Sequence, residues 1–241
     1  IKQHCDNILW KRYLGKQFTP DEVDKIKFSP KIEDFKDVEL IIETTSENYE
    51  VKYSVIEELN ILNNPDLIVA TNTSGLLISK LTSRYKYTNN FFGLHFFNPL
   101  SASKLVEITN PDNHSVEQLI TIVKLLGKQY ITIEEKAGLF VNRLLTPFWL
   151  DAVRELQQSS LTPHEIDNAI KLGCNHPVGA LELLDMIGLD VFVDFCNNVY
   201  NETGDSRFLP PQLLNDKVAK GYFGSKTNQG FYKWENNQKV L

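Results

Sequence analysis

The chain has 241 residues, of which 42% are hydrophobic and 23% charged, enough for one large or two modest domains with a full core. A formal net charge of −6 argues against nucleic acid or an anionic membrane as the main partner. No apolar run approaches the roughly 18 residues that a membrane span needs. Three scattered cysteines without a CxxC pair predict reduced thiols in a reducing compartment, the cytoplasm or the mitochondrial matrix.

In the first part of the chain, short apolar runs alternate with amphipathic segments. The runs that predict strands are residues 38–42, 67–70, 91–97, 105–108 and 130–133. The segments that predict helices are residues 1–16, 47–63 with Ser46 as N-cap, a short one ending at 81, and 115–126. This alternation is typical of βαβ units and predicts an α/β fold with a Rossmann-like, mainly parallel sheet.

The composition changes near residue 137, and beyond it the sequence has no convincing strand pattern. A long helix is predicted over 139–159, with a bend at Pro147. Thr162-Pro163-His164-Glu165 has the form of a capping box that starts another helix. Glycines at 188, 204 and 221 are placed to end later helices. We therefore predict two domains, a dinucleotide-binding domain over 1–136 and an all-helical domain over 137–241.

One stretch combines the pattern of a buried strand with residues that can do chemistry. The apolar run from Phe91 to Phe97 carries His95 near its end and stops at Asn98-Pro99, where proline lacks the N–H that a sheet ladder needs. His95 is thus predicted at the carboxyl end of a strand, where open α/β sheets bind their ligands.

Glu107 lies in the next apolar run, after Lys104-Leu105-Val106, and could reach the imidazole of His95. A carboxylate beside a histidine fixes its tautomer and favours the protonated ring, so such a pair could move a proton near neutral pH. On these residues alone, a core histidine and an unrelated surface glutamate remain the alternative.

Several short motifs follow one another in an order that resembles the 3-hydroxyacyl-CoA dehydrogenase family. They are Thr71-Asn-Thr-Ser74, His95-Phe-Phe-Asn-Pro99, Lys104-Leu-Val-Glu107, Phe140-Val-Asn-Arg143, Lys171-Leu-Gly173, His176-Pro-Val-Gly179, Glu182-Leu-Leu-Asp185, Gly188-Leu-Asp190, Gly224-Ser-Lys-Thr227 and Gly230-Phe-Tyr232. Each motif is weak alone, but together they extend from about residue 38 to 234. The chain departs from the family pattern at Gly75, where a second serine is usual, and at Ala180, where proline is usual.

The resemblance implies NAD as cofactor and reversible oxidation of a (3S)-3-hydroxyacyl thioester to the 3-oxoacyl thioester. It implies His95 as the base, Glu107 as the carboxylate that orients it, and Ser74 and Asn142 as hydrogen-bond donors to the substrate oxygen. The residues that it implies for the cofactor are Glu47, Lys52, Asn98 and Lys226. The substrate would be an acyl-CoA; the alternative is an acyl group tethered to a carrier protein.

Each of these residues also has an ordinary structural interpretation. Ser74 could be a helix N-cap, Asn142 a polar residue on a helix face, and Lys226 a solvated lysine in a turn. Glu47 and Lys52 could be an exposed charged pair. No metal site is predicted, because the remaining histidines of interest have no partners at ligand spacing; they are His4, His114 and His164.

Two further expectations concern the glycine-rich turn of the nucleotide-binding domain and the oligomeric state. The sequence contains no Gly-x-Gly-x-x-Gly turn, so we expect it to start inside the nucleotide-binding domain; a non-catalytic relative is the alternative. A homodimer is expected through the helical domain, which has large apolar side chains to spare. They are Phe140, Leu144, Phe148, Trp149, Phe192 and Phe195.

Overall fold

The computed structural model describes residues 25–100, 102–110, 116–236 and 238–240. The chain separates into two compact units, residues 1–136 and residues 137–241, which we call the first and second unit. The predicted helix over 1–16 and the first residue of the one predicted over 115–126 lie outside the described residues.

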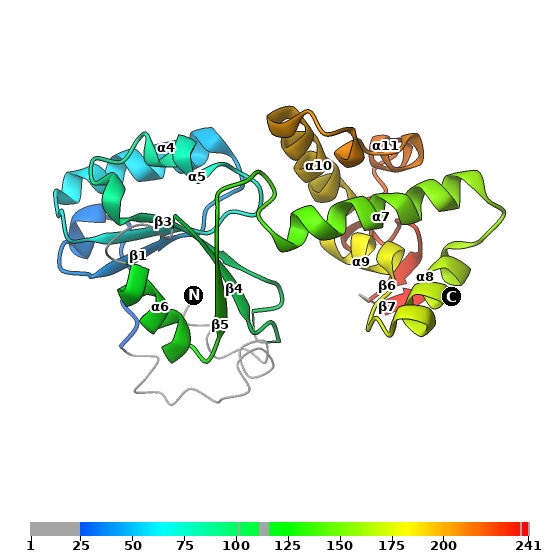
Figure 1. Ribbon diagram of the computed structural model, residues 1–241, viewed down its shortest axis with the longest axis horizontal. Coiled ribbons are helices and arrows are strands. Elements are labelled where there is room, and N and C mark those ends of the chain that lie inside the picture. The colour runs from blue at the N-terminus through cyan, green and yellow to red at the C-terminus, as the bar shows by residue number, and fades with distance from the viewer. Residues whose placement is uncertain (1–24, 101, 111–115, 237, 241) are drawn as a thin grey trace. The chain divides into compact units, whose positions relative to one another are not determined.

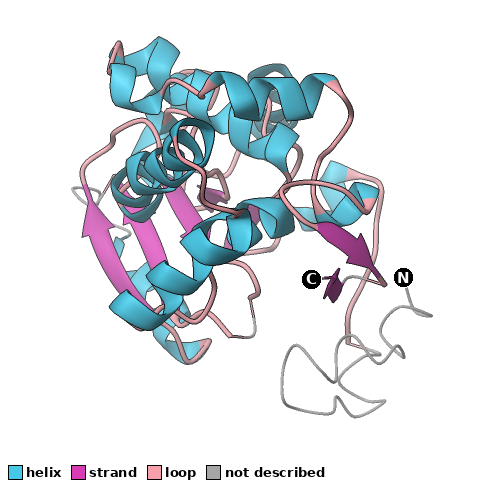
Figure 2. Cartoon of the chain, turned by 90° about the vertical axis from the view of Figure 1, so that its right-hand side faces the viewer, coloured by secondary structure: helices cyan, strands magenta, loops and turns pink. Residues whose placement is uncertain are grey.

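The first unit is built on a five-stranded sheet in the order β1-β2-β3-β4-β5 (Figure 1). The strands are β1 (Leu40–Glu43), β2 (Ile68–Thr71), β3 (Phe91–Phe96), β4 (Leu105–Thr109) and β5 (Gln129–Ile133). All neighbouring strands are parallel except β3 and β4, which run antiparallel. The strands lie side by side with helices packed over them (Figure 2). The predicted mainly parallel α/β sheet is confirmed.

Helices cover both faces of this sheet because successive residues of a buried strand point to opposite sides. The helices are α4 (Tyr49–Leu59), α5 (Ile78–Thr82) and α6 (Val116–Leu125), with short 3-10 turns η1 (Ile32–Phe35), η2 (Asn60–Leu62) and η3 (Thr88–Asn90). Val69 of β2 packs with α4 and α5, whereas its neighbours Ile68 and Ala70 pack with α6 on the other face. α4 starts later than predicted, because the side chain of Asn48, and not of Ser46, accepts the N–H groups of Glu50 and Val51.

The second unit is mainly helical, as predicted. Its helices are α7 (Val141–Gln158), α8 (Pro163–Cys174), α9 (Ala180–Ile187), α10 (Leu189–Thr203) and α11 (Gln212–Ala219), with 3-10 turns η4 (Ser206–Phe208) and η5 (Ser225–Thr227). The Thr162–Glu165 capping box is present at the start of α8. Pro147 lies inside α7, and Gly188 and Gly204 follow the ends of α9 and α10.

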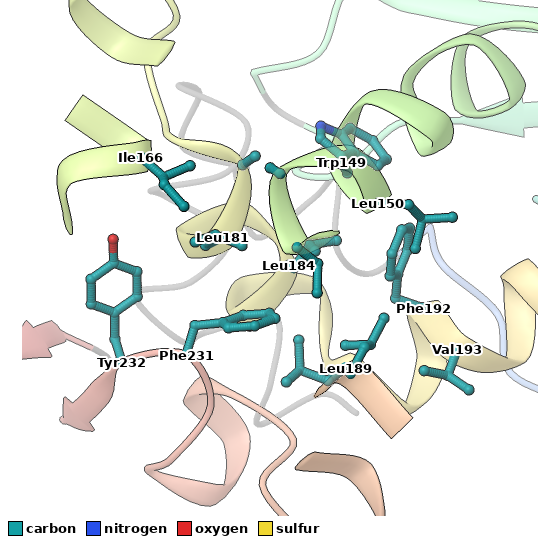
Figure 3. Packing of buried hydrophobic residues seen from close by; sticks show 14 of the residues in the cluster. Trp149, Leu150, Ile166, Leu181, Leu184, Leu189, Phe192, Val193, Phe231 and Tyr232 are labelled. Carbon is teal, nitrogen blue, oxygen red and sulfur yellow. The ribbon is translucent and has the colours of Figure 1, made fainter. Parts of the chain in front are cut away.

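One expectation for the second unit is wrong: it does contain strands. β6 (Lys233–Glu235) and β7 (Gln238–Val240) pair as an antiparallel hairpin. Each strand has only three residues, and most of them are polar, so no apolar run marks them in the sequence. Trp234 of β6 is buried and belongs to the core that helices α7 to α11 share; other members of this core are drawn in Figure 3.

Two buried aspartates organise this core. Asp185 accepts hydrogen bonds from the backbone N–H groups of Phe231 (2.8 Å) and Tyr232 (2.9 Å) and from the indole of Trp234 (2.9 Å). A Cβ on Gly230 would lie 2.0 Å from Asp185 Oδ1, which is why the chain needs glycine there. Asp167 accepts the N–H groups that open α9 and the hydroxyl of Tyr232 (2.7 Å). The Glu182-Leu-Leu-Asp185 and Gly230-Phe-Tyr232 motifs therefore belong together as structure.

No helix in the described part of the chain is both long and apolar enough to cross a lipid bilayer. Of the three cysteines, Cys174 is exposed and Cys196 is buried, both as free thiols; Cys5 lies outside the described residues. Burial raises the pKa of the Cys196 thiol to about 12.

Candidate active site

His95 and Glu107 meet across β3 and β4, the antiparallel pair of the five-stranded sheet. The β3–β4 register places them directly opposite each other, and His95 Nδ1 lies 2.7 Å from Glu107 Oε2. Both residues are buried, with exposed fractions of 5% and 1%. A carboxylate only accepts hydrogen bonds, so Nδ1 is the donor, and in the neutral form of the ring Nε2 is the nitrogen that can accept a proton. The alternative of an unrelated surface glutamate is wrong, since Glu107 faces inward onto the histidine.

Ser74 lies on the other side of the imidazole. Its Oγ is 3.3 Å from His95 Nε2, the nitrogen that Glu107 does not contact. The N-cap interpretation of Ser74 is wrong, because α5 begins at Ile78 with Leu77 as its N-cap. Ser74, His95 and Glu107 therefore form one line of polar contacts, with a hydroxyl at one end and a carboxylate at the other.

Glu47 holds the loop that carries Ser74. Its Oε1 accepts hydrogen bonds from Thr73 Oγ1 (2.6 Å) and from the backbone N–H groups of Ser74 (2.8 Å) and Gly75 (2.9 Å). Glu47 is thus next to the site, as the sequence suggested, but this oxygen is occupied by the protein itself. Gly75, where the family usually has serine, contributes a backbone donor to this arrangement.

The interpretation of Lys52 as part of an exposed charged pair is wrong. It is fully buried and forms an ion pair with Glu43 at 2.8 Å, so it is not part of an exposed pair with Glu47. Its ammonium also lies 3.1 Å from the carbonyl of Asn72 and 3.4 Å from that of Thr45. These three acceptors match the three N–H donors of the ammonium group, so each donor has a partner within the protein.

Glu43 is ionised in this setting. Burial by itself would raise the pKa of its carboxyl, but hydrogen bonds from Lys52, Thr45 and Thr71 outweigh burial and hold the pKa below its ordinary value. No motif in the sequence singles out Glu43. The only signal was a glutamate closing the apolar run of β1, with a lysine following on the next helix.

The remaining predicted site residues are exposed or belong to the second unit. Asn98 is exposed just beyond β3, and the Asn98–Pro99 peptide bond is cis. Asn142 is half-buried in the first turn of α7. Lys226 lies in η5 and is exposed, but it is not merely solvated, because its Nζ is 2.6 Å from Asp190 Oδ2.

Among the described residues, no group of three or more histidine, cysteine, aspartate or glutamate side chains is placed to hold a metal ion. His164 lies 2.8 Å from Asn168 on the surface of α8. His4 and His114 lie outside the described residues.

Comparison with known proteins assigns the chain. The family described as 3-hydroxyacyl-CoA dehydrogenase, NAD binding domain, matches residues 1–136, and the C-terminal domain of the same family matches residues 138–234. The chain belongs to the 3-hydroxyacyl-CoA dehydrogenase family. It is an oxidoreductase of this type with an NAD-binding domain, as the resemblance implied.

Individual relatives agree with this assignment. The chain is 39% identical to a 3-hydroxybutyryl-CoA dehydrogenase of Clostridioides difficile, over 84% of this chain and 73% of the relative. It is 36% identical to the mitochondrial hydroxyacyl-coenzyme A dehydrogenase of Sus scrofa, over 82% of this chain and 64% of the relative. Among solved structures, the (S)-3-hydroxybutyryl-CoA dehydrogenase of Ralstonia eutropha is similar, with a TM-score of 0.86 and 33% identity over 95% of this chain and 82% of that one.

Residues in the loops that follow β1, β2 and β3 fit the nicotinamide end of NAD. The Ser74 hydroxyl and the exposed Asn98 amide can donate, and the Glu47 carboxylate can accept, as a carboxamide and a ribose require. The 241 residues contain no Gly-x-Gly-x-x-Gly turn of the kind that usually receives the pyrophosphate, so the fit is limited to that end.

Proposed function

We propose that this dehydrogenase oxidises the hydroxyl group of a (3S)-3-hydroxyacyl-CoA to the 3-oxoacyl-CoA, and catalyses the reverse reduction. The observation that carries the proposal is the buried His95–Glu107 pair at 2.7 Å, with the Ser74 hydroxyl 3.3 Å from the free ring nitrogen. The (S) configuration is proposed from the similar Ralstonia eutropha enzyme, whose name states it.

In this mechanism His95 is the general base. Its Nε2 takes the proton of the substrate hydroxyl, and the C3–H bond breaks with its electron pair as C3–O becomes a carbonyl. A bound NAD, with Glu47 and Asn98 beside its nicotinamide end, would supply the acceptor for this hydride. Glu107 accepts a hydrogen bond from Nδ1–H throughout, which keeps the ring oriented and compensates the positive charge that the ring gains. Ser74 donates a hydrogen bond to the substrate oxygen, and Asn142 is proposed for the same role.

Two assays test this function. Acetoacetyl-CoA with NADH should be reduced, and (3S)-3-hydroxybutyryl-CoA with NAD should be oxidised, whereas the (3R) isomer should not. Oxidation needs Nε2 without a proton, so the rate of oxidation should rise with pH. The rate of reduction should fall with rising pH. The same acyl group on a carrier protein is measured in parallel. Turnover restricted to the carrier-bound form would replace CoA in the proposal, and no turnover with any form would favour the non-catalytic alternative.

We further propose a homodimer formed through the second unit, in which only two of the six apolar residues listed from the sequence, Phe140 and Leu144, are exposed enough to contribute. Trp149 and Phe192 are buried in the core and pack edge to face at 5.9 Å, and Phe148 and Phe195 are partly buried against the same core. Side chains that remain exposed include Phe140 and Leu144 near the start of α7, Met186 and Ile187 at the end of α9, and Val191 on α10. These are the apolar surfaces that a second copy would cover.

A further inference from the structure

A buried ion pair lies near β1, which β2 separates from the β3 strand of His95. Glu43 ends β1 and Lys52 lies on α4, and their exposed fractions are 3% and 0%. Removing two charges from water is unfavourable, and replacing such a pair by apolar residues often leaves stability unchanged or improves it. Stability alone is therefore a weak reason for this pair, and its contacts suggest another.

Asn72 connects this ion pair to the histidine. Its backbone N–H donates to the carbonyl of Glu43 (2.8 Å), its carbonyl accepts from Lys52 (3.1 Å), and its side-chain Oδ1 accepts the N–H of Phe96 (3.1 Å). Phe96 is the residue directly after His95. One asparagine thus ties the ends of β1, α4 and β3 together at the edge of the sheet where the site lies.

The Phe96 contact matters because the sheet itself stops short of the histidine on this side. The β2–β3 pairing ends at Thr71 opposite Gly93, two residues before His95. On the other side, β4 pairs with β3 as far as Phe96. The end of β3 is therefore joined to β2 through the Asn72 side chain. The position of Asn72 is in turn fixed by Lys52 and by the backbone of Glu43.

The same network reaches Ser74 along the chain. Thr71, just before Asn72, donates its hydroxyl to Glu43 Oε2 (2.5 Å). Ser74, two residues after Asn72, has its backbone held by Glu47. The groups that face Nε2 and Nδ1 of His95 are Ser74 and Glu107. Both depend on correctly placed strand ends, but only Ser74 depends on the loop that follows β2.

We propose that Glu43, Lys52 and Asn72 are positioning residues that set the distance between His95 and Ser74, and that Lys52 acts through Asn72 and not by touching the cofactor. This rests on the dehydrogenase function proposed above. A shift of about 1 Å in a catalytic group can lower the rate about 100-fold, so loss of the network should lower kcat about 10- to 100-fold. The KM values for both substrates should change little, because no binding contact is removed.

The test compares three variants of the full natural protein. They are Asn72→Leu, the double variant Glu43→Gln/Lys52→Met, and the triple variant that combines all of these substitutions. The double variant removes both charges, because Lys52→Met alone would leave Glu43 buried and unpaired. Asn60→Leu is the matched control: Asn60 also bridges two backbone segments, accepting from Lys86 N (2.7 Å) and donating to Arg84 O (2.9 Å), but away from the site.

We expect kcat per folded molecule to fall in Asn72→Leu and in the double variant, to fall little further in the triple, and to be unchanged in Asn60→Leu. Unchanged kcat in Asn72→Leu, fully additive losses, or a rise in the KM for NAD alone in the double variant would each overturn the proposal. Nitrogen NMR of the His95 ring gives a readout without catalysis. Its signals should shift in Asn72→Leu and not in Asn60→Leu, even if the wild type proves to have no dehydrogenase activity.

Discussion

Both units bury carboxylates, but the two units surround them with different partners. In the first unit, Glu107 faces a histidine and Glu43 faces a lysine, so each negative charge meets a group that carries or can take a positive one. In the second unit, Asp185 is held by two backbone N–H groups and an indole, and Asp167 by backbone N–H groups and a phenol. Neutral donors fix a chain in place; a titratable partner can also exchange a proton.

The pKa shifts follow the same division. Burial raises the pKa of Asp185, and the hydrogen bonds from Trp234, Phe231 and Tyr232 do not outweigh it. At Glu43 the bond from Lys52, together with those from two hydroxyls, does outweigh burial, and the pKa is lowered. A buried acid is therefore not by itself a sign of function; the chemistry of its partners separates the catalytic region from the structural one.

The largest expected effect on turnover comes from replacing His95 or Glu107 by an uncharged residue. His95→Gln removes the base, and turnover should fall by about 10²–10⁴-fold. Glu107→Gln keeps the shape but withdraws the charge that faces the ring, so its loss should also be large and fall mainly on kcat. Steady-state kinetics in both directions measures both variants and their combination.

The double variant should lose little more than the worse single one, since members of a catalytic unit are not additive. Near-normal turnover in Glu107→Gln, or fully additive losses, would contradict the assignment of the two residues as one unit.

The second prediction concerns the structural carboxylate. Asp185→Asn keeps the size of the side chain but turns one acceptor oxygen into a donor, which then faces a buried donor. One such unsatisfied group destabilises by about 1–3 kcal/mol. Urea unfolding should show this loss. Asp205→Asn is the control, because Asp205 pairs with Arg207 on the surface and its replacement should have little effect. Equal stability of the two variants would remove the structural role given to Asp185.

How far the sequence predicts these features differs between fold and site. The apolar runs and the Thr162–Glu165 capping box determine elements that the structure confirms, because burial and capping are local patterns. Glu43 and Asp185 look alike in the sequence, since each directly follows a short apolar run. Lys52 and Thr71 lie 9 and 28 positions from Glu43, and the donors to Asp185 lie 46 to 49 positions away, so only the fold distinguishes the two carboxylates.

The third prediction contrasts exposed leucines of the two units. Leu144 on α7 is 57% exposed and Leu125 on α6 is 81% exposed. If the second unit forms the dimer, Leu144→Glu should weaken association at least about tenfold, which corresponds to about 1.4 kcal/mol, because a carboxylate is poorly tolerated against an apolar surface. Leu125→Glu should have no effect. Analytical ultracentrifugation measures both, and a wild type that remains monomeric at micromolar concentration would exclude the dimer.

The smallest expected effect is on the pH dependence of stability, and it bears on Glu43. Its pKa is lower in the folded chain than the ordinary value of 4.5, so near and below pH 4.5 the unfolded chain binds more protons than the folded one. Stability from this group is therefore present above pH 4.5 and is lost as the pH falls through the folded pKa. One proton contributes at most about 1.4 kcal/mol per pH unit.

The variant Glu43→Gln/Lys52→Met has no titrating carboxyl at this position, so its unfolding free energy should fall less steeply than that of the wild type between pH 5 and the acid transition. Asp185 acts in the opposite direction: its raised pKa makes its contribution most favourable at low pH and less so as the pH rises above the ordinary value of 3.8. Urea titrations at a series of pH values separate the two, since Asp185→Asn should steepen the acid loss while the Glu43 variant flattens it. If both variants changed the slope in the same direction, the contrast between a charge-paired and a neutrally bound carboxylate would not hold for this protein.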